Sequence, residues 1–547
     1  MFYKKKHNVF MGLVNFLMVF TLIVSTLMVS APKVSAAAVY VTDSGSTLVV
    51  NTGSGLIYTI NKANGDMVSC KLNGTELTGT KPSHINSGLG SANVTWSRSP
   101  SGSTLVITVD AGTLTHYYVS RGGENIIYMA TYISEEPSIG CLRYIFRGNG
   151  NILKNVPTES DIRNAVGFEG GPDVFSFSNG KTASKYYGND QAKDLTIRGC
   201  TGNGVGVFMA YGSRETGIGG PFYRDIQFQS GIDTEIYNVM NHAIGATESF
   251  RMGLYGPYAY VFTNGSTPSI PDFSWMRSLN LKGWVSSRGA VAVTGLSGME
   301  SDQEYTYVFS NENAQYWTTA YSTNGFGKCT NMKPGTYTME VYKGELCVHT
   351  VTGVTVTANN TTMLHTQTIS NDPAKKSAIW RIGKWDGTPL EFLNGKNISI
   401  MHPSDIRNAG WGPVTYTVGS SSTVQFPAAQ FRAANSPTTI KFNLNSSQAS
   451  SYHTLNIGIT TAYNNGRPSV TINGHALAAK SASSQPKTRS LTVGTYRGNN
   501  TTFSWSIPAS YFVNGTNTIS ITPISGNADM STYLSASYAY DCVELAD

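Results

Sequence analysis

Apolar and polar residues alternate in short runs along most of this chain, and the runs end at glycine or asparagine. The stretch 454–463 is the clearest example, because Leu455, Ile457 and Ile459 alternate with polar residues and glycine. A period of two is typical of a strand with one buried face. The stretch 47–74 repeats the pattern and breaks at Gly-Ser-Gly and Asn-Gly, which are turn signals. We see no run of ten or more residues with helical periodicity, so the pattern predicts an all-β fold.

The predicted strands form three blocks. The first covers roughly 240 residues, which favours one large sandwich over two small ones. The second, with a turn at Lys333–Thr336, fits a fibronectin- or immunoglobulin-like sandwich. The third follows a linker at 370–376 and fits a jelly roll that folds alone and contributes binding, not chemistry. The expected divisions are a signal peptide at 1–36, a catalytic sandwich at 37–277, a fibronectin-like domain at 278–370 and a carbohydrate-binding-like domain at 371–547.

The first 36 residues have the pattern of a secretory signal. Lys4–Lys6 precede an apolar run from about Met11 to Ser30, and Val34–Ala36 offers small residues for cleavage. The alternative is an uncleaved membrane anchor, because the run is about long enough to span a bilayer. The pattern favours cleavage, and we expect a secreted, extracellular protein with no membrane contact after cleavage.

Net charge changes the picture little. The formal charge is +6, but residues 1–36 hold four lysines and no acid, so 39 − 4 − 33 leaves +2 for the remainder. That balance is no nucleic-acid footprint. Only 13% of residues are charged and 30 are tyrosine, a composition that suits secreted β-sandwiches and sugar binding.

The spacing of the cysteines limits which metal sites and disulfides the chain can form. The six cysteines contain no C-x-x-C pair, so a zinc site is not expected. Cys329 and Cys347 flank a predicted hairpin and form the most plausible disulfide. No D-x-D-x-D-G loop is present. Calcium among loop Asp and Asn residues stays open, and no other cofactor is indicated.

One segment, Tyr237–Tyr260, gathers a His, an Arg, a Glu and several Tyr. Glycine and proline in the sequence Gly-Leu-Tyr-Gly-Pro-Tyr at 253–258 predict that the preceding strand ends in a turn there. Glu248 and Arg251 lie three residues apart and are expected to form an ion pair that braces the segment.

Several motifs in order resemble one family. They are SKYY (184–187), GGPFYRDI (219–226), TESFRMGLYGPY (247–258), MKPGTYTM (332–339), IGKWDGTP (382–389) and DCVEL (541–545). Together they resemble the rhamnogalacturonan endolyases of polysaccharide lyase family 4 over about residues 39–547. The resemblance implies a galactose-mutarotase-like super-sandwich, a fibronectin-like sandwich and a jelly roll. It also implies β-elimination between rhamnose and galacturonic acid in rhamnogalacturonan I, a pectic polysaccharide, leaving a 4,5-unsaturated galacturonate. We expect a monomer.

Such an elimination needs a cation for the carboxylate, a base for the C5 proton and an acid for the leaving oxygen. The resemblance places Lys185 as the base, Arg143 and Arg163 as substrate-binding cations and Tyr237 as a substrate-side aromatic. On a strand, Arg143 and Arg147 share one face, which could receive a carboxylate. A solvated strand face would show the same pattern.

The acid is where the chain departs from its relatives. They carry a functional His three residues before Thr-Glu, where this chain has Ile244. His242 lies two residues earlier and would share a face with Ile244 on a strand. We therefore assign His242 as the acid. The alternatives are Tyr186, Tyr237, Tyr255 or water, with His242 only capping or packing.

Two other functions compete with the lyase. A non-catalytic polysaccharide-binding protein on the same fold is favoured by the departure at Ile244. A hydrolase would need two carboxylates flanking the scissile bond, whereas the motifs offer Lys and Arg. Three tryptophans of the third block could stack on sugars, but core packing is the commoner fate: Trp380, Trp385 and Trp411.

Overall fold

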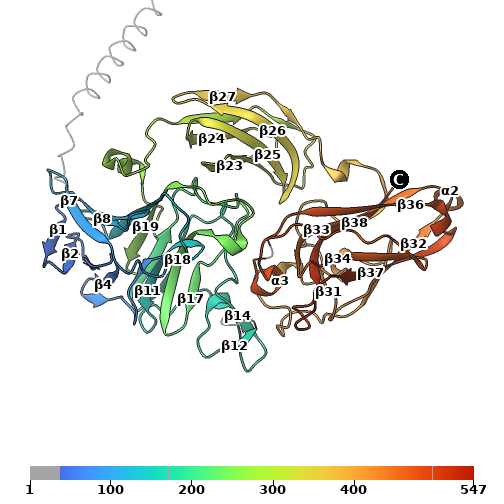
Figure 1. Ribbon diagram of the computed structural model, residues 1–547, viewed down its shortest axis with the longest axis horizontal. Coiled ribbons are helices and arrows are strands. Elements are labelled where there is room, and N and C mark those ends of the chain that lie inside the picture. Colours follow the sequence, from blue (N-terminus) through green and yellow to red (C-terminus); the bar gives the residue numbers. More distant parts are fainter. Residues whose placement is uncertain (1–36, 170–172, 496) are drawn as a thin grey trace, which may run out of the picture.

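The computed structural model describes residues 37–169, 173–495 and 497–547. The expected signal peptide at 1–36 lies outside the described residues. Figure 1 shows three β-rich bodies: the first in blue to green, the second in yellow and the third in orange to red. Each body has its own large apolar cluster. The predicted all-β fold is confirmed.

In the described residues, the first body is built from four sheets. The five-stranded sheet has the order β1 (Tyr40–Asp43), β2 (Thr47–Asn51), β3 (Leu56–Asn61), β4 (Met67–Leu72), β5 (Thr75–Glu76). The seven-stranded sheet has the order β15 (Ile197–Gly202), β16 (Val205–Ala210), β19 (Gly253–Thr263), β10 (Ile126–Ile133), β9 (Leu114–Arg121), β8 (Thr104–Asp110), β7 (Asn93–Arg98). The four-stranded sheet has the order β17 (Phe228–Ser230), β18 (Asp233–His242), β11 (Cys141–Asn149), β6 (His84–Ile85). The small sheet is β12 (Val166–Glu169), β13 (Val174–Ser176), β14 (Thr182–Ala183).

Strand β11 shows how alternation divides core from cleft. Leu142, Tyr144 and Phe146 are buried in the main core, which also receives residues of the seven-stranded sheet. Arg143 and Arg147 lie on the opposite face and are partly exposed. The expected sharing of one face by the two arginines is therefore confirmed. That face of the four-stranded sheet carries the candidate site.

The turn expected at 253–258 is wrong, because these residues open the long strand β19. Strand β10 pairs with β19 on both sides of this point, with a register shift between Met129 and Thr131. The shift is a β-bulge, and bulges accept the proline and glycine that a regular ladder rejects. Gly256 takes a φ of +100° there, which glycine adopts without strain. The Gly-Pro pair therefore bends the strand without ending it.

The second body is a small sandwich with one extra strand pair. Its sheets are β24 (Gly327–Met332), β20 (Gly289–Val293), β27 (Thr361–Leu364); β21 (Leu296–Ser297), β28 (Gln367–Thr368); and β23 (Gln315–Thr319), β22 (Tyr305–Ser310), β25 (Gly335–Lys343), β26 (Leu346–Val356). The turn predicted at Lys333–Thr336 joins β24 to β25, with Gly335 and Thr336 opening β25. The expected Cys329–Cys347 disulfide is wrong, because both thiols are free. Cys329 is on β24 and Cys347 on β26, in different sheets of the sandwich.

The third body stacks two five-strand layers. One contains β29 (Ala378–Gly383), β38 (Ser537–Ala546), β33 (His453–Tyr463), β36 (Thr501–Ile507), with β31 (Ala429–Phe431) also paired to β38. The other has the order β30 (Val414–Thr417), β32 (Thr438–Leu444), β37 (Gly515–Ile524), β34 (Arg467–Ile472), β35 (His475–Ala476). Trp380 and Trp385 are buried, and Trp411 packs edge-on against Phe431, so their expected core role is confirmed.

Helical turns are short in the described chain. The α-helical turns are α2 (Ser446–Ala449) and α3 (Ser490–Val493). The 3-10 turns are η1 (Thr158–Ser160), η2 (Ala243–Gly245), η3 (Ser274–Leu279), η4 (Pro373–Lys375), η5 (Gly395–Asn397), η6 (Thr423–Gln425) and η7 (Ala509–Tyr511). Among the described residues, no helix has the length and apolar character needed to cross a membrane.

The bodies are joined by specific contacts. The segment expected to be a plain linker carries Asp372, whose carboxylate accepts from Lys343 Nζ at 2.7 Å with both side chains buried. The first and third bodies meet at the small sheet that Figure 1 shows between them. There, Asp405 accepts from the backbone N–H and hydroxyl of Thr182, and Tyr187 donates to the Thr492 carbonyl at 2.5 Å. The third domain is therefore fixed against the SKYY segment.

Candidate active site

Three of the predicted site residues, Arg143, Lys185 and His242, lie near the point where β11 begins and β18 ends. Cys141 on β11 faces His242 on β18 in the strand register. Burial raises the pKa of the Cys141 thiol to about 12, and the charges acting on that thiol include Arg143 and Lys185. Arg143, Lys185 and His242 are thus grouped around one point of the sheet face, although they come from different segments.

His242 is held by a buried carboxylate. Its Nδ1 donates to Asp225 Oδ2 at 3.0 Å, while Tyr223 and the N–H of Ile226 also donate to Asp225. Burial raises the pKa of Asp225, but the His242 charge and these hydrogen bonds outweigh it, so the pKa lies below its ordinary value. An ionised Asp225 fixes the tautomer with a proton on Nδ1 and leaves Nε2 for a ligand.

Lys185 shares a carboxylate with the third domain. Its Nζ lies 3.3 Å from Asp173 Oδ1, and Arg489 Nη2 donates to Asp173 Oδ2 at 2.8 Å. Arg489 comes from the segment that leads into α3. The Lys185 ammonium also lies 5.5 Å from the centre of the Tyr186 ring. A residue of the third body therefore helps to position the candidate base.

A pocket of about 440 Å³ opens at this point. His242, Ile244, Asp225, Asp173 and Tyr186 line it from the first body; the third body supplies 462–465, 483, 485–489, 493, 495, 497 and 527. The volume is within the range of small-ligand sites. The expected separation of the third domain from the chemistry is wrong in geometry, because its loops form a wall of the pocket that contains His242.

The lining of this pocket, called here the basic pocket, carries net positive charge. Its Lys and Arg residues number four and its Asp residues two, which gives 4 − 2 = +2 before His242 is counted: Arg224, Lys487, Arg489, Arg497; Asp173, Asp225. Such a lining favours an anionic ligand. Guanidinium groups are suited to carboxylates, which they bind through paired N–H donors.

The other predicted substrate residues are occupied by internal contacts. Arg143 Nη2 donates to Ser87 at 3.2 Å, and Arg147 Nε donates to Glu235 at 2.7 Å. Tyr237 is buried and donates its hydroxyl to Glu235. Its expected contact with substrate stays a prediction.

Arg163 lies apart from His242. It pairs with Asp161 at 2.5 Å and lines a different pocket of about 610 Å³, with Phe175 and Glu235. Glu235 and His242 occupy β18 seven residues apart, which corresponds to roughly 23 Å along a strand. The structure therefore does not bring Arg163 to the pocket of His242, and its substrate role would require a ligand that extends along the sheet.

The argument that placed His242 and Ile244 on one strand face is wrong. Strand β18 ends at His242, and Ile244 belongs to the turn η2. Both residues nevertheless line the basic pocket, and 44% of Ile244 is exposed. The expected ion pair of Glu248 and Arg251 is confirmed at 3.3 Å.

Sequence reasoning missed three polar residues of the site. Asp225 lies inside the GGPFYRDI motif, so the motif could have identified it as a site residue. Asp173 and Arg489 lie outside every motif quoted above, and only the fold brings them to Lys185. In the part of the chain that the structure describes, no group of three or more His, Cys, Asp or Glu is arranged to hold a metal.

Family models match all three bodies. The model described as "Rhamnogalacturonan lyase B, N-terminal" matches residues 40–283. Models of polysaccharide lyase family 4, domain II and domain III, match residues 287–364 and 378–545. The fold is therefore that of a polysaccharide lyase with a fibronectin-like second domain and a carbohydrate-binding-module-like third domain.

Whole-length relatives agree with these matches. The chain is 42% identical to rhamnogalacturonate lyase A of Emericella nidulans over 517 residues, covering 93% of this chain and 96% of that protein. It is 42% identical to the enzyme of the same name from Aspergillus aculeatus over 518 residues, with the same two coverages. A probable rhamnogalacturonate lyase A of Aspergillus terreus is 43% identical, covering 90% of this chain and 92% of that protein. The chain belongs to polysaccharide lyase family 4.

Proposed function

We propose that this lyase cleaves the rhamnogalacturonan I backbone between rhamnose and galacturonic acid by β-elimination, outside the cell. The observation that carries the proposal is the basic pocket, in which His242 and the ion partner of Lys185 lie beside a cationic wall. The relatives carry the name rhamnogalacturonate lyase, which supports the same substrate.

The steps follow from what the residues can do. The cationic lining receives the galacturonate carboxylate and stabilises the negative charge that develops when C5 loses its proton. Lys185 takes that proton once its amine is neutral, and Asp173 then keeps Arg489 as its partner. His242, as imidazolium, donates from Nε2 to the oxygen leaving C4, while Asp225 stabilises the positive ring. The C4–O bond breaks as the C4=C5 double bond forms.

The test is an assay of the purified protein on rhamnogalacturonan I, with two readouts. A lyase yields ultraviolet absorbance from the new double bond conjugated to the carboxylate. A hydrolase yields reducing ends without that absorbance, and a non-catalytic binder yields neither. Absence of the unsaturated product in a folded preparation would overturn the proposal.

A further inference from the structure

A second and larger pocket lies where the three bodies meet, with a volume of about 950 Å³. Loops of the first body line it at 219–222 and 247–251. The second body contributes strand residues of β22, β25 and β26, and the third contributes 387, 460 and 497–500. Nothing in the reaction proposed above uses this pocket, called here the junction pocket.

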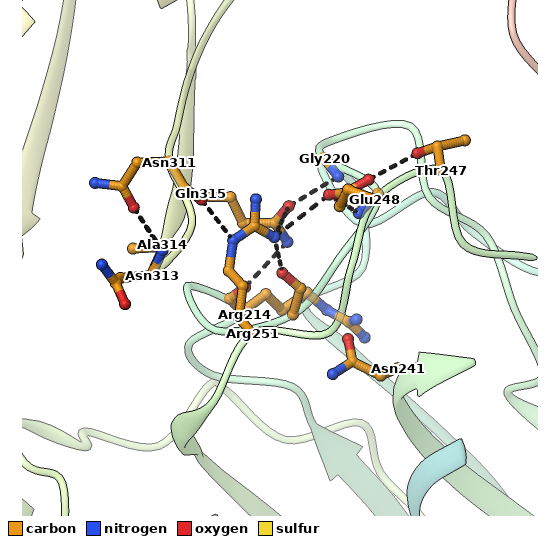
Figure 2. Close-up of polar contacts among 12 residues, drawn as sticks. Arg214, Gly220, Asn241, Thr247, Glu248, Arg251, Asn311, Asn313, Ala314 and Gln315 are labelled. Carbon is orange, nitrogen blue, oxygen red and sulfur yellow. Dashed lines mark hydrogen bonds and ion pairs between the residues drawn. The ribbon is translucent and has the colours of Figure 1, made fainter. Parts of the chain in front are cut away.

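Its floor is held by a fixed polar network. Figure 2 shows Arg251 between Glu248 of the first body and Gln315 of the second. Arg251 Nε donates to the Asn311 carbonyl at 3.0 Å, and the N–H of Gly220 donates to Gln315 Oε1 at 2.9 Å. These bonds join the first two bodies directly under the pocket. The pocket is therefore preformed, which lowers the entropy cost of binding a ligand.

The charge of the lining selects against acidic sugars. The junction pocket has four glutamates and two arginines, which gives 2 − 4 = −2: Glu248, Glu312, Glu340, Glu345; Arg251, Arg497. Arg251 already pairs with Glu248, and Arg497 Nη2 donates to the Gly219 carbonyl at 2.9 Å and to Thr247 at 3.0 Å. A uronate would meet net negative charge in this lining.

The same lining suits neutral sugars. Tyr342 is half-buried and meets Phe222 edge-on at 5.1 Å, which provides an apolar surface for the C–H face of a sugar ring. Glutamate oxygens accept hydrogen bonds from hydroxyl groups, and so can the amide oxygens of Asn499 and Asn500. The Nδ2 atoms of these two residues donate to the carbonyls of Ser484 and Glu345, and each keeps one further N–H for a ligand. The volume lies near the upper end of ordinary ligand sites, as an oligosaccharide requires.

Arg497 lines both the junction pocket and the basic pocket, so the two share a wall. We infer that the junction pocket binds a neutral oligosaccharide and that, when the proposed function holds, this ligand is a neutral side branch of the chain bound in the basic pocket. The junction pocket then sets a preference for branched over bare polysaccharide. This inference rests on the proposed function for the origin of the ligand, but binding itself is measured without any cleavage.

The first experiment is calorimetric titration of the full-length protein with β-1,4-galactotetraose, with α-1,5-arabinotetraose and with trigalacturonate. At least one neutral tetrasaccharide is expected to bind. Tyr342→Ala should weaken that binding at least tenfold and leave trigalacturonate binding unchanged. Tyr321→Ala is the matched control, because Tyr321 is an exposed tyrosine of the same body that does not line the pocket. Failure of both neutral sugars to bind would overturn the inference.

A second variant keeps the test valid if Tyr342→Ala fails to fold. Asn500→Trp places a large side chain at an exposed position of the lining and should block neutral sugars without disturbing a core. Unchanged binding in both Tyr342→Ala and Asn500→Trp would also overturn the inference.

The cleavage arm compares kcat/KM on branched and debranched rhamnogalacturonan I. Tyr342→Ala should lower the branched-to-debranched ratio about fivefold or more and leave the debranched rate unchanged. An unchanged ratio overturns the role in branch preference. If the parent cleaves neither substrate, the proposed function fails, and the calorimetric arm still decides whether the pocket binds neutral sugar.

Discussion

The basic pocket and the junction pocket share Arg497 and are both closed by loops of the third domain, yet their linings have opposite charge. The difference arises from the bodies that supply the remaining walls. The second body gives three glutamates to the junction pocket and lines no part of the basic pocket, which is formed by the first and third bodies. The arrangement of the three domains, rather than any single motif, therefore sets the charge of each pocket and with it the kind of sugar that the pocket can bind.

The largest effect is expected for the proposed chemistry at the basic pocket, and Lys185→Ala tests it, because the ion partner of Lys185, Asp173, lines that pocket. We expect elimination to be abolished, since no other base is assigned, while the melting temperature stays nearly unchanged. Lys185→Arg should fail as well, because guanidinium stays protonated. Lys181→Ala, an exposed lysine four residues upstream, is the matched control and should keep full activity. Activity of Lys185→Ala within tenfold of the parent would remove Lys185 from the role of base.

The next largest effect is expected at His242. Replacement by Ala should lower kcat by roughly 10²–10⁴-fold with little change in KM, the usual scale for a positioned proton donor. Asp225→Asn should lower kcat less, because it removes the charge that stabilises the imidazolium and leaves the His242 ring itself in place. Ile244→His in the His242→Ala background should restore part of the rate, since Ile244 lines the same pocket. A parental kcat in His242→Ala would transfer the acid role to a tyrosine or to water.

The charge contrast itself is tested at Arg489. Its replacement by Ala removes one cation from the basic pocket and the shared partner of Asp173, so KM for the charged polymer should rise about tenfold, or about 1.4 kcal/mol. The matched control is Lys441→Ala, which removes an exposed cation of the same domain that lines neither pocket. Neutral-sugar binding in the junction pocket should stay the same. Equal losses for charged and neutral ligands would mean that the substitution disturbs the domain contact instead of the charge.

The smallest effect concerns how the stability of the fold next to the junction pocket depends on pH. Burial raises the pKa of Glu391 to about 7, with neighbouring Asp386 adding to the rise and Lys384 opposing it. Buried Asp541, whose own pKa is raised by burial and by Asp386, accepts from the N–H of Gly387 in the pocket wall. A raised folded-state pKa favours the protonated form, so this stability is complete below about pH 4.5 and is lost as pH rises through about 7.

Replacing Glu391 by Gln should therefore flatten the fall of the melting temperature between pH 5 and about 8, a contribution of about 2 kcal/mol or less. Glu312→Gln, an exposed glutamate of the junction pocket, provides the control. Thermal unfolding followed by circular dichroism at several pH values measures the difference. The same pH slope in the Glu391→Gln protein and the parent would contradict the assignment.

How far the sequence could predict this molecule depends on the range of the interaction. Alternation along β11 and β33 is local, so the all-β fold and the shared face of Arg143 and Arg147 were predictable. The turn at 253–258 was a false prediction, because a Gly-Pro pair is compatible with either a turn or a bulge and only the partner strand β10 decides between them. The Cys329–Cys347 pairing failed for a similar reason, since the sheet each strand joins is a non-local property.

The site shows the same limit. The SKYY motif predicted Lys185, and the spacing from Thr-Glu predicted His242. The strand geometry assumed for His242 and Ile244 was wrong, because β18 ends at His242. Arg489 could not be predicted, because its segment has no motif and gains its role by lying against Asp173, which is 316 residues away in sequence.

The buried pair Lys343 and Asp372 also has a practical consequence for how the protein resists proteolysis. A flexible tether between domains is the usual first point of cleavage. Here Asp372 also accepts from the N–H of Ala374 in η4, so the tether is folded against the second domain with its charge neutralised by a lysine that is 1% exposed. The Lys343–Asp372 ion pair would have to break before a protease could reach the peptide bonds of this segment. Asp372→Ala should therefore release two large fragments under limited digestion, from a protein whose parent stays intact.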